Sequence, residues 1–270
     1  MPEDVISLSS PKGPAIPFED WSPELQKARV YEQILLDIIL GELPPGGRLD
    51  EKVLTRRYEA GLAGVRDALS RLALEGLVVR RSRTGTMVAP LDIIEVRQAY
   101  EARGLIEPHC AALAAANAGP DDIAELRAAF DGAEAAIRAN DHRALVAMDQ
   151  RFHAAVARAG RNATLARIII PLHHKAARFW IYSMADDTDA ERVDEIERHR
   201  ALAELIAQGD IDGARDAVAG VLGVFSDNLK RMVMGGPISG GLAFRGRARP
   251  ASEAADVAQL RPADARLGKA

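Results

Sequence analysis

The hydrophobic pattern in the first third of the chain predicts three short helices. The first carries an apolar stripe at helical spacing and ends near Gly41, where an LPPG turn at 43–46 redirects the chain. Its stripe consists of Val30, Tyr31, Ile34, Leu35 and Ile38. The segment 50–77 then reads as a helix, a tight turn and a second helix. We expect the break at Ala60-Gly61, where a left-handed residue costs least.

Each helix of this helix-turn-helix segment has one apolar side. In the first, that side is formed by Val53, Leu54 and Tyr58. In the second, it is formed by Val65, Ala68, Leu69 and Leu72, at i, i+3, i+4 and i+7. The opposite, outward face consists of Ala63, Arg66, Asp67 and Ser70. A short helix that presents an arginine and is braced by another helix suits the DNA major groove, although an ordinary helical hairpin would show the same pattern.

Two β-prone stretches follow, at 77–80 and 86–89, separated by the polar turn RSRTG at 81–85. The tip of this predicted hairpin carries Arg81 and Arg83. A basic hairpin directly after a helix-turn-helix is typical of a winged helix, whose wing contacts phosphates or the minor groove. The pattern therefore predicts a compact DNA-binding domain at 25–90.

From Leu91 to Met234 the pattern is helical throughout and predicts an antiparallel bundle. Its breaks divide it into six helices, at about 91–117, 121–139, 141–159, 162–184, 189–208 and 210–233. Residues 1–24 read as a flexible arm, because they contain five prolines and several serines. Residues 235–270 read as a flexible tail, because they begin with GGPISGG and continue in alternating charged and small residues. The expected fold class is mainly α, with an N-terminal winged helix-turn-helix domain and a C-terminal antiparallel six-helix bundle.

The uneven distribution of charge supports this division. The chain of 270 residues has a formal net charge of −4, but residues 27–90 contain eleven Lys and Arg against eight Asp and Glu, which leaves −7 for the remainder. A basic DNA-binding domain joined to an acidic body fits modest DNA affinity per subunit, as in a homodimer. The single cysteine, Cys110, excludes an internal disulfide, and no apolar run approaches the roughly 20 residues that span a membrane. We therefore expect a soluble, cytoplasmic protein.

Polar residues on inward faces mark a candidate metal site in the bundle. Asp149 and His153 lie one turn apart within the apolar stripe of the third bundle helix, and His199 lies among the inward residues of the fifth. A carboxylate that faces a core is costly unless it is paired or ligated, and an Asp/His pair at i, i+4 can bind one ion from a single helix face. Isolated inward histidines are more often hydrogen-bonded core residues, so both interpretations stay open.

Three stretches, VYEQILLDIILGELPPGGRLDEKVLTRRY, VRDALSRLALEGLVVRR and TGTMVA, cover most of residues 28–90. Together they resemble the N-terminal domain of the GntR family of bacterial transcription regulators, and the resemblance implies DNA contacts from Lys52, Arg66 and Gly85. With the outward face and the wing, the predicted DNA contacts are Lys52, Arg66, Ser70, Arg81, Arg83 and Gly85. The family usually opens the recognition helix with a Ser-Arg-Thr-Pro run, whereas this chain has GLAG at 61–64, so we expect poorer direct readout.

Two stretches of the bundle, MDQRFHAAVARAGRN and EIERHRALAELIAQGDIDGARDAV, resemble the FCD effector domain of the FadR subgroup of GntR regulators. Many such domains hold a divalent metal, such as Zn or Ni, through an Asp and three His. The resemblance implies Asp149, His153 and His199 as ligands and places the fourth 22 positions after His199, at Val221. We expect Val221 to face inward and to fill that position with an apolar group. An effector carboxylate, or His173, could complete the shell.

An arginine on the first bundle helix indicates an effector pocket. Arg103 shares the inward arc with Glu107, so either the two form a buried ion pair or Arg103 offers its guanidinium to a ligand carboxylate. The corresponding arginine of FadR-type domains looks like a lining residue of the effector cavity. The predicted pocket suits a small organic acid, with contacts from Tyr100, Arg103, His173 and Trp180.

These features favour a dimeric repressor that binds a near-palindromic double-stranded DNA operator and responds to a small carboxylate effector. One alternative is a hydrolase with a Zn-activated water on the three candidate ligands, but no general base is evident beside them. Another is a regulator whose DNA specificity is degraded by the GLAG departure at 61–64.

Overall fold

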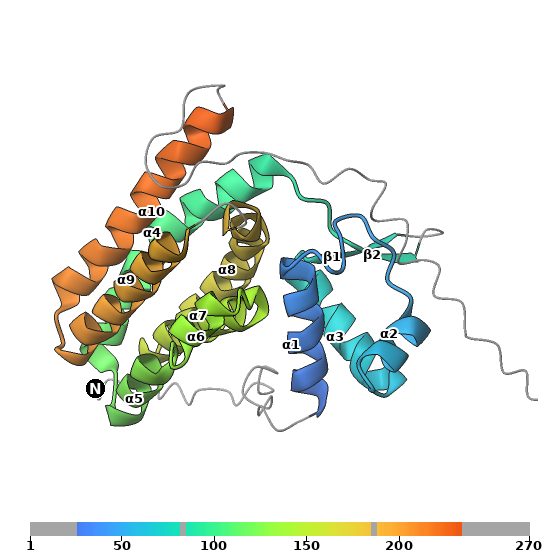
Figure 1. The fold of residues 1–270 in the computed structure, drawn as a ribbon, viewed down its shortest axis with the longest axis horizontal. Helices are drawn as coiled ribbons and strands as arrows, with labels where there is room; N and C mark the ends of the chain where they lie inside the picture. Colours follow the sequence, from blue (N-terminus) through green and yellow to red (C-terminus); the bar gives the residue numbers. More distant parts are fainter. Residues whose placement is uncertain (1–25, 82–84, 185–187, 234–270) are drawn as a thin grey trace, which may run out of the picture.

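The computed structural model describes residues 26–81, 85–184 and 188–233, which form two domains (Figure 1). The first, which we call the reader, comprises α1 (Gln26–Ile39), α2 (Glu51–Arg57), α3 (Leu62–Leu74), β1 (Val78–Arg81) and β2 (Gly85–Val88). The second, which we call the helical domain, comprises α4 (Ile93–Asn117), α5 (Pro120–Ala128), α6 (Ala133–Arg138), α7 (His142–Ala159), α8 (Ala163–Met184), α9 (Asp189–Ala207) and α10 (Ile211–Val233). The expected mainly α fold, a winged helix-turn-helix before a helical bundle, is confirmed.

The reader has its own hydrophobic core, built from the predicted stripes. Ile34 of α1 packs with Leu69 and Leu72 of α3, and all three are fully buried. Burial of an aliphatic side chain of this size contributes about 1.5–3 kcal/mol, so tertiary packing rather than helix propensity holds these short helices. Asp50 caps α2, because its carboxylate accepts hydrogen bonds from the amides of Lys52 and Val53 at 2.8 and 3.0 Å.

Two details of the predicted helix-turn-helix are wrong. Val53 is 49% exposed, whereas Leu54 beside it is 2% exposed, so only part of the predicted apolar side of α2 faces the core. The left-handed residue of the turn is Glu59, with a φ of 49°, whereas Gly61 has a φ of −69° and caps α3. A left-handed non-glycine residue costs roughly 1–2 kcal/mol, which the packing of α2 on α3 offsets.

The wing is an antiparallel hairpin whose register runs from Val78 opposite Val88 to Arg81 opposite Gly85. Gly85 has a φ of +85°, a conformation that glycine adopts without steric cost. Arg48 forms an isolated antiparallel bridge with Met87 and so fastens the loop before α2 to the wing. Residues 82–84, which include the predicted DNA contact Arg83, lie outside the described residues.

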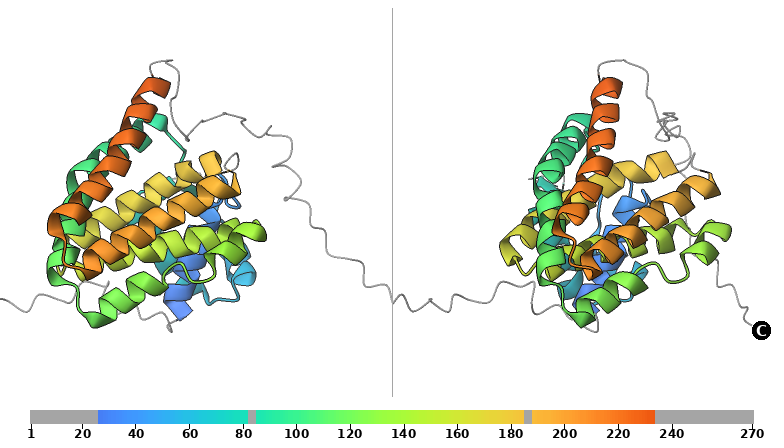
Figure 2. Two further views of the ribbon diagram at one scale, coloured as in Figure 1. Left: turned by 60° about the vertical axis from the view of Figure 1, so that its left-hand side comes forward. Right: turned by 90° about the vertical axis from the view of Figure 1, so that its left-hand side faces the viewer.

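The helical domain is a bundle in which α7 contacts α4, α5, α6 and α8, while α4 and α10 lie side by side along one edge (Figures 1 and 2). Its core includes Phe152, which is fully buried on α7 and packs against Phe130 with ring centroids 5.5 Å apart. The expected helix at 121–139 is instead two helices, α5 and α6, because Gly132 adopts a φ of 83° between them. The other bundle helices begin and end within two residues of the prediction.

The predicted inward orientation of Val221 is wrong. Its side chain is 43% exposed, whereas Ala214, Val218 and Leu222 of α10 are buried. Since these buried residues are spaced at i, i+4 and i+8, the residue one position before Leu222 falls at the exposed border of the stripe. Val221, at the position where the family resemblance expects a fourth metal ligand, therefore does not fill the metal site with an apolar side chain.

The reader packs directly on α7 and α8 of the helical domain. Val146 of α7 and Ala177 of α8 belong to the same buried cluster as the core of the reader. Arg143 of α7 donates to the carboxylate of Asp37 on α1, which is 2% exposed and also accepts from the hydroxyl of Tyr58 at 2.6 Å. The two domains therefore share both apolar and charged contacts.

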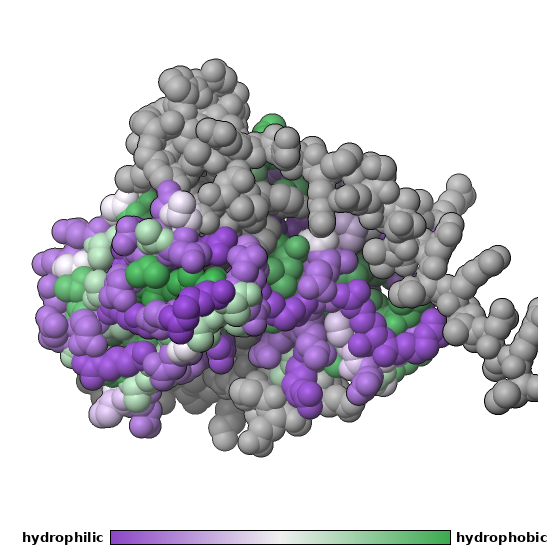
Figure 3. Space-filling view, viewed as in Figure 1, coloured by the Kyte–Doolittle hydropathy of each residue, from purple (hydrophilic) through white to green (hydrophobic). Residues whose placement is uncertain are grey.

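The surface in the view of Figure 3 is predominantly hydrophilic, with apolar side chains in separated areas. Several large apolar side chains are nevertheless exposed, among them Leu74 at 90% and Leu105 at 82%. Within the described ranges, no helix has the length and hydropathy that crossing a membrane requires.

Candidate functional site

The outward face of α3 carries the central residues of the predicted DNA contact. Arg66 has 60% of its side chain exposed, and its Nε donates to Oε2 of Glu51 at 2.7 Å. The hydroxyl of Ser70 donates to the carbonyl of Arg66 at 2.6 Å and accepts from Arg80 at 2.9 Å. The pair with Glu51 takes only Nε of Arg66, so Arg66 can keep this partner and direct its terminal nitrogens to DNA.

Other basic side chains lie beside this face, on α2 and on the wing. Lys52 and Arg81, two of the predicted DNA contacts, are exposed. The exposed Arg48 places its guanidinium 3.9–4.0 Å from the position that a Cβ would take at Gly85. Sequence reasoning missed Arg48 and Arg80 as candidate contacts, although basic residues beside the LPPG turn and in the wing strand were the available signals.

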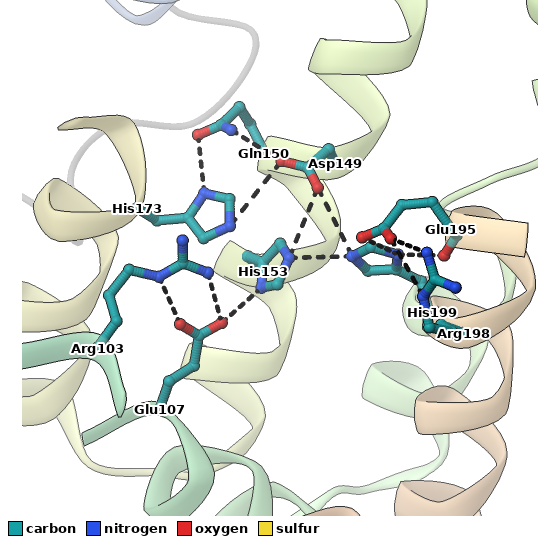
Figure 4. A network of polar contacts seen from close by, with 9 residues as sticks. All are labelled: Arg103, Glu107, Asp149, Gln150, His153, His173, Glu195, Arg198 and His199. Atoms are coloured by element: carbon teal, nitrogen blue, oxygen red, sulfur yellow. Dashed lines mark hydrogen bonds and ion pairs between the residues drawn. The ribbon is translucent and has the colours of Figure 1, made fainter. Parts of the chain in front are cut away.

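A second group of polar side chains gathers inside the helical domain (Figure 4). Four helices contribute to it: α4 with Arg103 and Glu107, α7 with Asp149, Gln150 and His153, α8 with His173, and α9 with His199. The three predicted metal ligands are brought together. Oδ1 of Asp149 lies 3.6 Å from Nε2 of both His153 and His199, and these two Nε2 atoms are 3.1 Å apart. We call Asp149, His153 and His199 the donor triangle.

The outer hydrogen bonds of the two histidines determine which ring nitrogens can bind a metal. Nδ1 of His199 lies 2.7 Å from the carbonyl oxygen of Glu195, which can only accept, so this Nδ1 carries a proton. Nδ1 of His153 lies 3.0 Å from Oε1 of Glu107 and donates to that carboxylate. In the neutral rings, both Nε2 lone pairs therefore point toward each other and toward Asp149. Three electron-rich atoms at this separation are stable only around a shared cation, either a proton or a metal ion.

A proton supplies such a cation when no metal is bound. Burial disfavours a charged ring, but Asp149 and Glu107 outweigh it and raise the pKa of His153 to about 9. Burial would raise the pKa of Asp149, but the neighbouring His153 and His199 lower it. Burial and the charge on His153 hold the pKa of His173 well below its usual value. Without metal, the cluster thus holds a protonated His153 beside an ionised Asp149 and a neutral His173.

The donor triangle fits a divalent metal such as Zn. Atoms that bind a tetrahedral ion at about 2.0–2.1 Å lie roughly 3.3 Å apart, close to the separations of 3.1 and 3.6 Å found here. One carboxylate and two imidazoles form a set that leaves a fourth position for water or a ligand. A second group that could hold a metal comprises Glu107, His153 and His173. It fits less well, because Arg103 already neutralises Glu107.

Arg103 and Glu107 form a buried ion pair on α4. Nε and Nη2 of Arg103 donate to Oε2 and Oε1 of Glu107 at 2.7 and 3.2 Å, and both side chains are less than a tenth exposed. Burial opposes a charged carboxylate, but Arg103 and His153 hold the pKa of Glu107 well below its usual range. Of the two roles expected for Arg103, the structure has the ion pair. Tyr100 stays close, with its ring centroid 5.0 Å from the Arg103 guanidinium carbon.

A small cavity lies beside the cluster, between α4, α7 and α8. Its lining includes Glu107, Cys110, Gln150, His153, His173 and His174. It has room for about one water molecule, which is too little for an organic effector in this conformation. Of the predicted effector residues, His173 lines this cavity, whereas Tyr100 and Arg103 are not among its lining residues. The side chain of Trp180 lies outside the described part of the chain.

Two family models match the chain. The model for bacterial regulatory proteins of the gntR family matches residues 26–88, and the FCD domain model matches residues 98–223. The chain is 29% identical over 191 residues to the "Probable D-xylose utilization operon transcriptional repressor" of Paenarthrobacter nicotinovorans. The aligned region covers 71% of this chain and 83% of that protein. It is 34% identical over 98 residues to the HTH-type transcriptional repressor GlaR of Escherichia coli (strain K12), and this aligned region covers 36% of this chain and 44% of that protein.

Solved structures share the fold. E. coli McbR/YncC superposes with a TM-score of 0.65 at 22% identity, over 77% of this chain and 99% of that one. A GntR transcriptional regulator from Rhodococcus sp. RHA1 superposes with a TM-score of 0.58 at 20% identity, over 76% and 97% of the two chains. At these identities, the similarity concerns the fold alone.

Proposed function

Because the chain belongs to the GntR family of transcriptional regulators and carries an FCD domain after its DNA-binding domain, we propose that it is a homodimeric repressor controlled by a small carboxylate and a divalent metal. Its relatives are transcriptional regulators rather than enzymes. Regulators of this family bind DNA operators and are usually dimeric, so two readers would occupy the halves of a near-palindromic operator. Residues 25–90 would bind DNA, and residues 91–234 would bind the effector and dimerise.

The donor triangle is the observation that carries the metal proposal. Asp149, His153 and His199 come from two helices, and the outer hydrogen bonds of both histidines leave their Nε2 lone pairs facing the same point. Such outer partners are typical of metal-binding histidines. We propose that Zn or Ni binds here in place of the proton on His153.

The fourth position is open to the effector. Val221 is exposed, and Nε2 of His173 lies 3.9 Å from Oδ2 of Asp149. A carboxylate at the open position would bind the metal, and Arg103 uses Nε and Nη2 for Glu107, so its remaining N–H donors stay available to a second polar group. The cavity has to widen for such a ligand, with Tyr100 and Trp180 as its proposed walls.

Metal titration tests the proposed site. The protein is stripped with a chelator and titrated with Zn²⁺ or Ni²⁺ by calorimetry. We expect one equivalent per subunit, with affinity at least tenfold weaker in Asp149→Asn and in His199→Asn. His109→Asn is the control, because His109 is an exposed histidine of α4. Unchanged affinity in both site variants would refute the metal proposal.

DNA binding tests the regulator itself. An operator is selected from a pool of random duplexes, and its affinity is measured by fluorescence anisotropy across a salt series with unrelated DNA as competitor. We expect salt-sensitive binding that survives the competitor and weakens about 5- to 150-fold with Arg66→Ala. Arg158→Ala is the control, because Arg158 is an exposed arginine of α7 that pairs with Glu125. Equal, weak binding to selected and unrelated DNA would instead support a reader without sequence discrimination, as the GLAG run at 61–64 suggests.

A further inference from the structure

The ion pair between Glu51 and Arg66 joins the two helices of the helix-turn-helix. Glu51 is the first residue of α2, and Asp50 fixes that turn by accepting from the amides of Lys52 and Val53. Arg66 lies on α3, which packs on α2, and its Nε donates to Oε2 of Glu51 at 2.7 Å. Both ends of the pair therefore stand on helices that packing holds in place.

This pair contributes orientation rather than stability. The side chain of Arg66 is 60% exposed and that of Glu51 is 31% exposed, and ion pairs with such exposure add little to the stability of a fold. A free arginine side chain samples many rotamers, so a partner on Nε restricts the plane of the guanidinium before DNA binds. The pair uses neither Nη1 nor Nη2 of Arg66. These two nitrogens remain available as an oriented fork of donors.

The rest of the outward face of α3 offers few groups for base recognition. The GLAG run at 61–64 carries no polar side-chain atom. The hydroxyl of Ser70 donates to the carbonyl of Arg66 and accepts from Arg80, so its proton is already used. A planar fork of N–H donors matches O6 and N7 of guanine in the major groove, which is the commonest specific contact to a base. The base that this face suits best is therefore guanine.

We propose that Glu51 is a positioning residue that holds Arg66 as a guanine reader, so that the sequence preference of each half-site centres on one G·C pair. This inference rests on the proposed role of the chain as a sequence-specific regulator. The carboxylate of Glu51 also lies beside the face that contacts DNA, where it repels the phosphates of every sequence. Glu51 thus lowers the affinity for unrelated DNA while it prepares Arg66 for guanine, and both effects raise the specificity ratio.

Replacement of single guanines in a selected duplex tests the base contact. An operator is selected from random duplexes, and each of its guanines is replaced in turn by 7-deazaguanine, which lacks the N7 acceptor. With the wild-type protein, we expect one replacement per half-site to weaken binding about fivefold or more, the lower end of the discrimination that a bidentate contact gives. Arg66→Lys keeps the charge without the fork, so the same replacement should change its affinity less than twofold.

Glu51→Gln tests the positioning role. In this variant the same replacement should change affinity less than twofold. The ratio of affinities for selected over unrelated DNA should fall at least fivefold, with the affinity for unrelated DNA unchanged or raised. A merely structural role for Glu51 would instead weaken binding to both DNAs. Adding Glu51→Gln to Arg66→Lys should cause no further loss of guanine discrimination, because no fork is left to orient.

Glu32→Gln is the matched control, because Glu32 is an exposed glutamate of α1 whose replacement removes the same charge from the reader. This variant should keep the wild-type discrimination for guanine. A wild-type protein that tolerates 7-deazaguanine at every guanine would overturn the guanine contact, and wild-type discrimination in Glu51→Gln would overturn the positioning role. Failure to select any duplex that the wild type prefers over unrelated DNA would instead refute the proposed sequence-specific regulator.

Discussion

Replacing Glu107 by Gln tests whether the buried pair on α4 prepares His153 for metal binding. The carboxylate of Glu107 accepts from Nδ1 of His153 at 3.0 Å and from Nε of Arg103 at 2.7 Å, and its side chain is 7% exposed. Glutamine keeps the size but carries no charge, so it cannot compensate Arg103. Loss of an outer partner of a metal-binding histidine typically reduces metal affinity about 10- to 100-fold.

The same change should also destabilise the metal-free protein. Breaking a buried ion pair by removing one partner costs about 3–5 kcal/mol, because the other charge stays buried without compensation. Urea unfolding of the chelator-treated protein measures this loss, and calorimetric titration with Zn²⁺ measures the loss of affinity.

Glu204→Gln is the matched control, because Glu204 forms a similar two-bonded pair with Arg127, with both side chains about half exposed. An exposed pair of this kind contributes at most about 1 kcal/mol, and it lies away from the cluster. Metal affinity within threefold of wild type in Glu107→Gln would refute the idea that the charge of Glu107 prepares His153 for metal binding.

Three further predictions concern DNA contact, pH and the core. Arg48→Ala should weaken binding of all DNA sequences similarly and reduce the slope of log affinity against log salt by about 0.9, as expected for one lost phosphate contact, whereas a sequence-dependent loss would indicate base contact. The raised pKa of His153, about 9 against a usual 6.5, stabilises the metal-free protein below pH 6.5, and this stability is lost between pH 6.5 and 9. Urea unfolding of chelator-treated protein across that range should show a loss on the order of 2–3 kcal/mol, and a flat profile would contradict a protonated His153. Phe152→Ala should cost about 3–5 kcal/mol in urea unfolding, because this ring is fully buried; a loss below 1 kcal/mol would mean that the core collapses around the cavity.

Most of the secondary structure was predictable because its signals are local. The carboxylate of Asp141 caps α7 by accepting from the amide of Ala144. Apolar residues at helical spacing then continue along α7 to Ala159. The split between α5 and α6 depends on the left-handed Gly132, and glycine also occurs inside α4 and α10, so its presence alone did not identify the break. The exposure of Val221 was missed because helical spacing defines an arc of residues but not its borders, which depend on how α10 packs on α4.

Most residues of the candidate site could be predicted from the sequence, whereas their hydrogen bonds and ion pairs could not. The spacing of Asp149 and His153 on one helix follows from sequence, as does the i, i+4 pair of Arg103 and Glu107. The choice between an ion pair and a ligand contact for Arg103 required the structure, because both use the same inward orientation. Gln150 was missed, since one amide among many polar residues gives no distinctive signal.

The sequence by itself determined most of the helices, the winged helix-turn-helix and the residue types of the donor triangle, because capping, periodicity and short spacing act over a few residues. Only the tertiary structure decided which distant groups meet. Glu75 and His174 are 99 positions apart, and Asp37 and Arg143 are 106 apart. Neither pair has a local signature, because a hydrogen bond between elements forms only after the packing of α1, α7 and α8 has brought its two ends together. The contacts between the two domains are therefore a property of the folded chain.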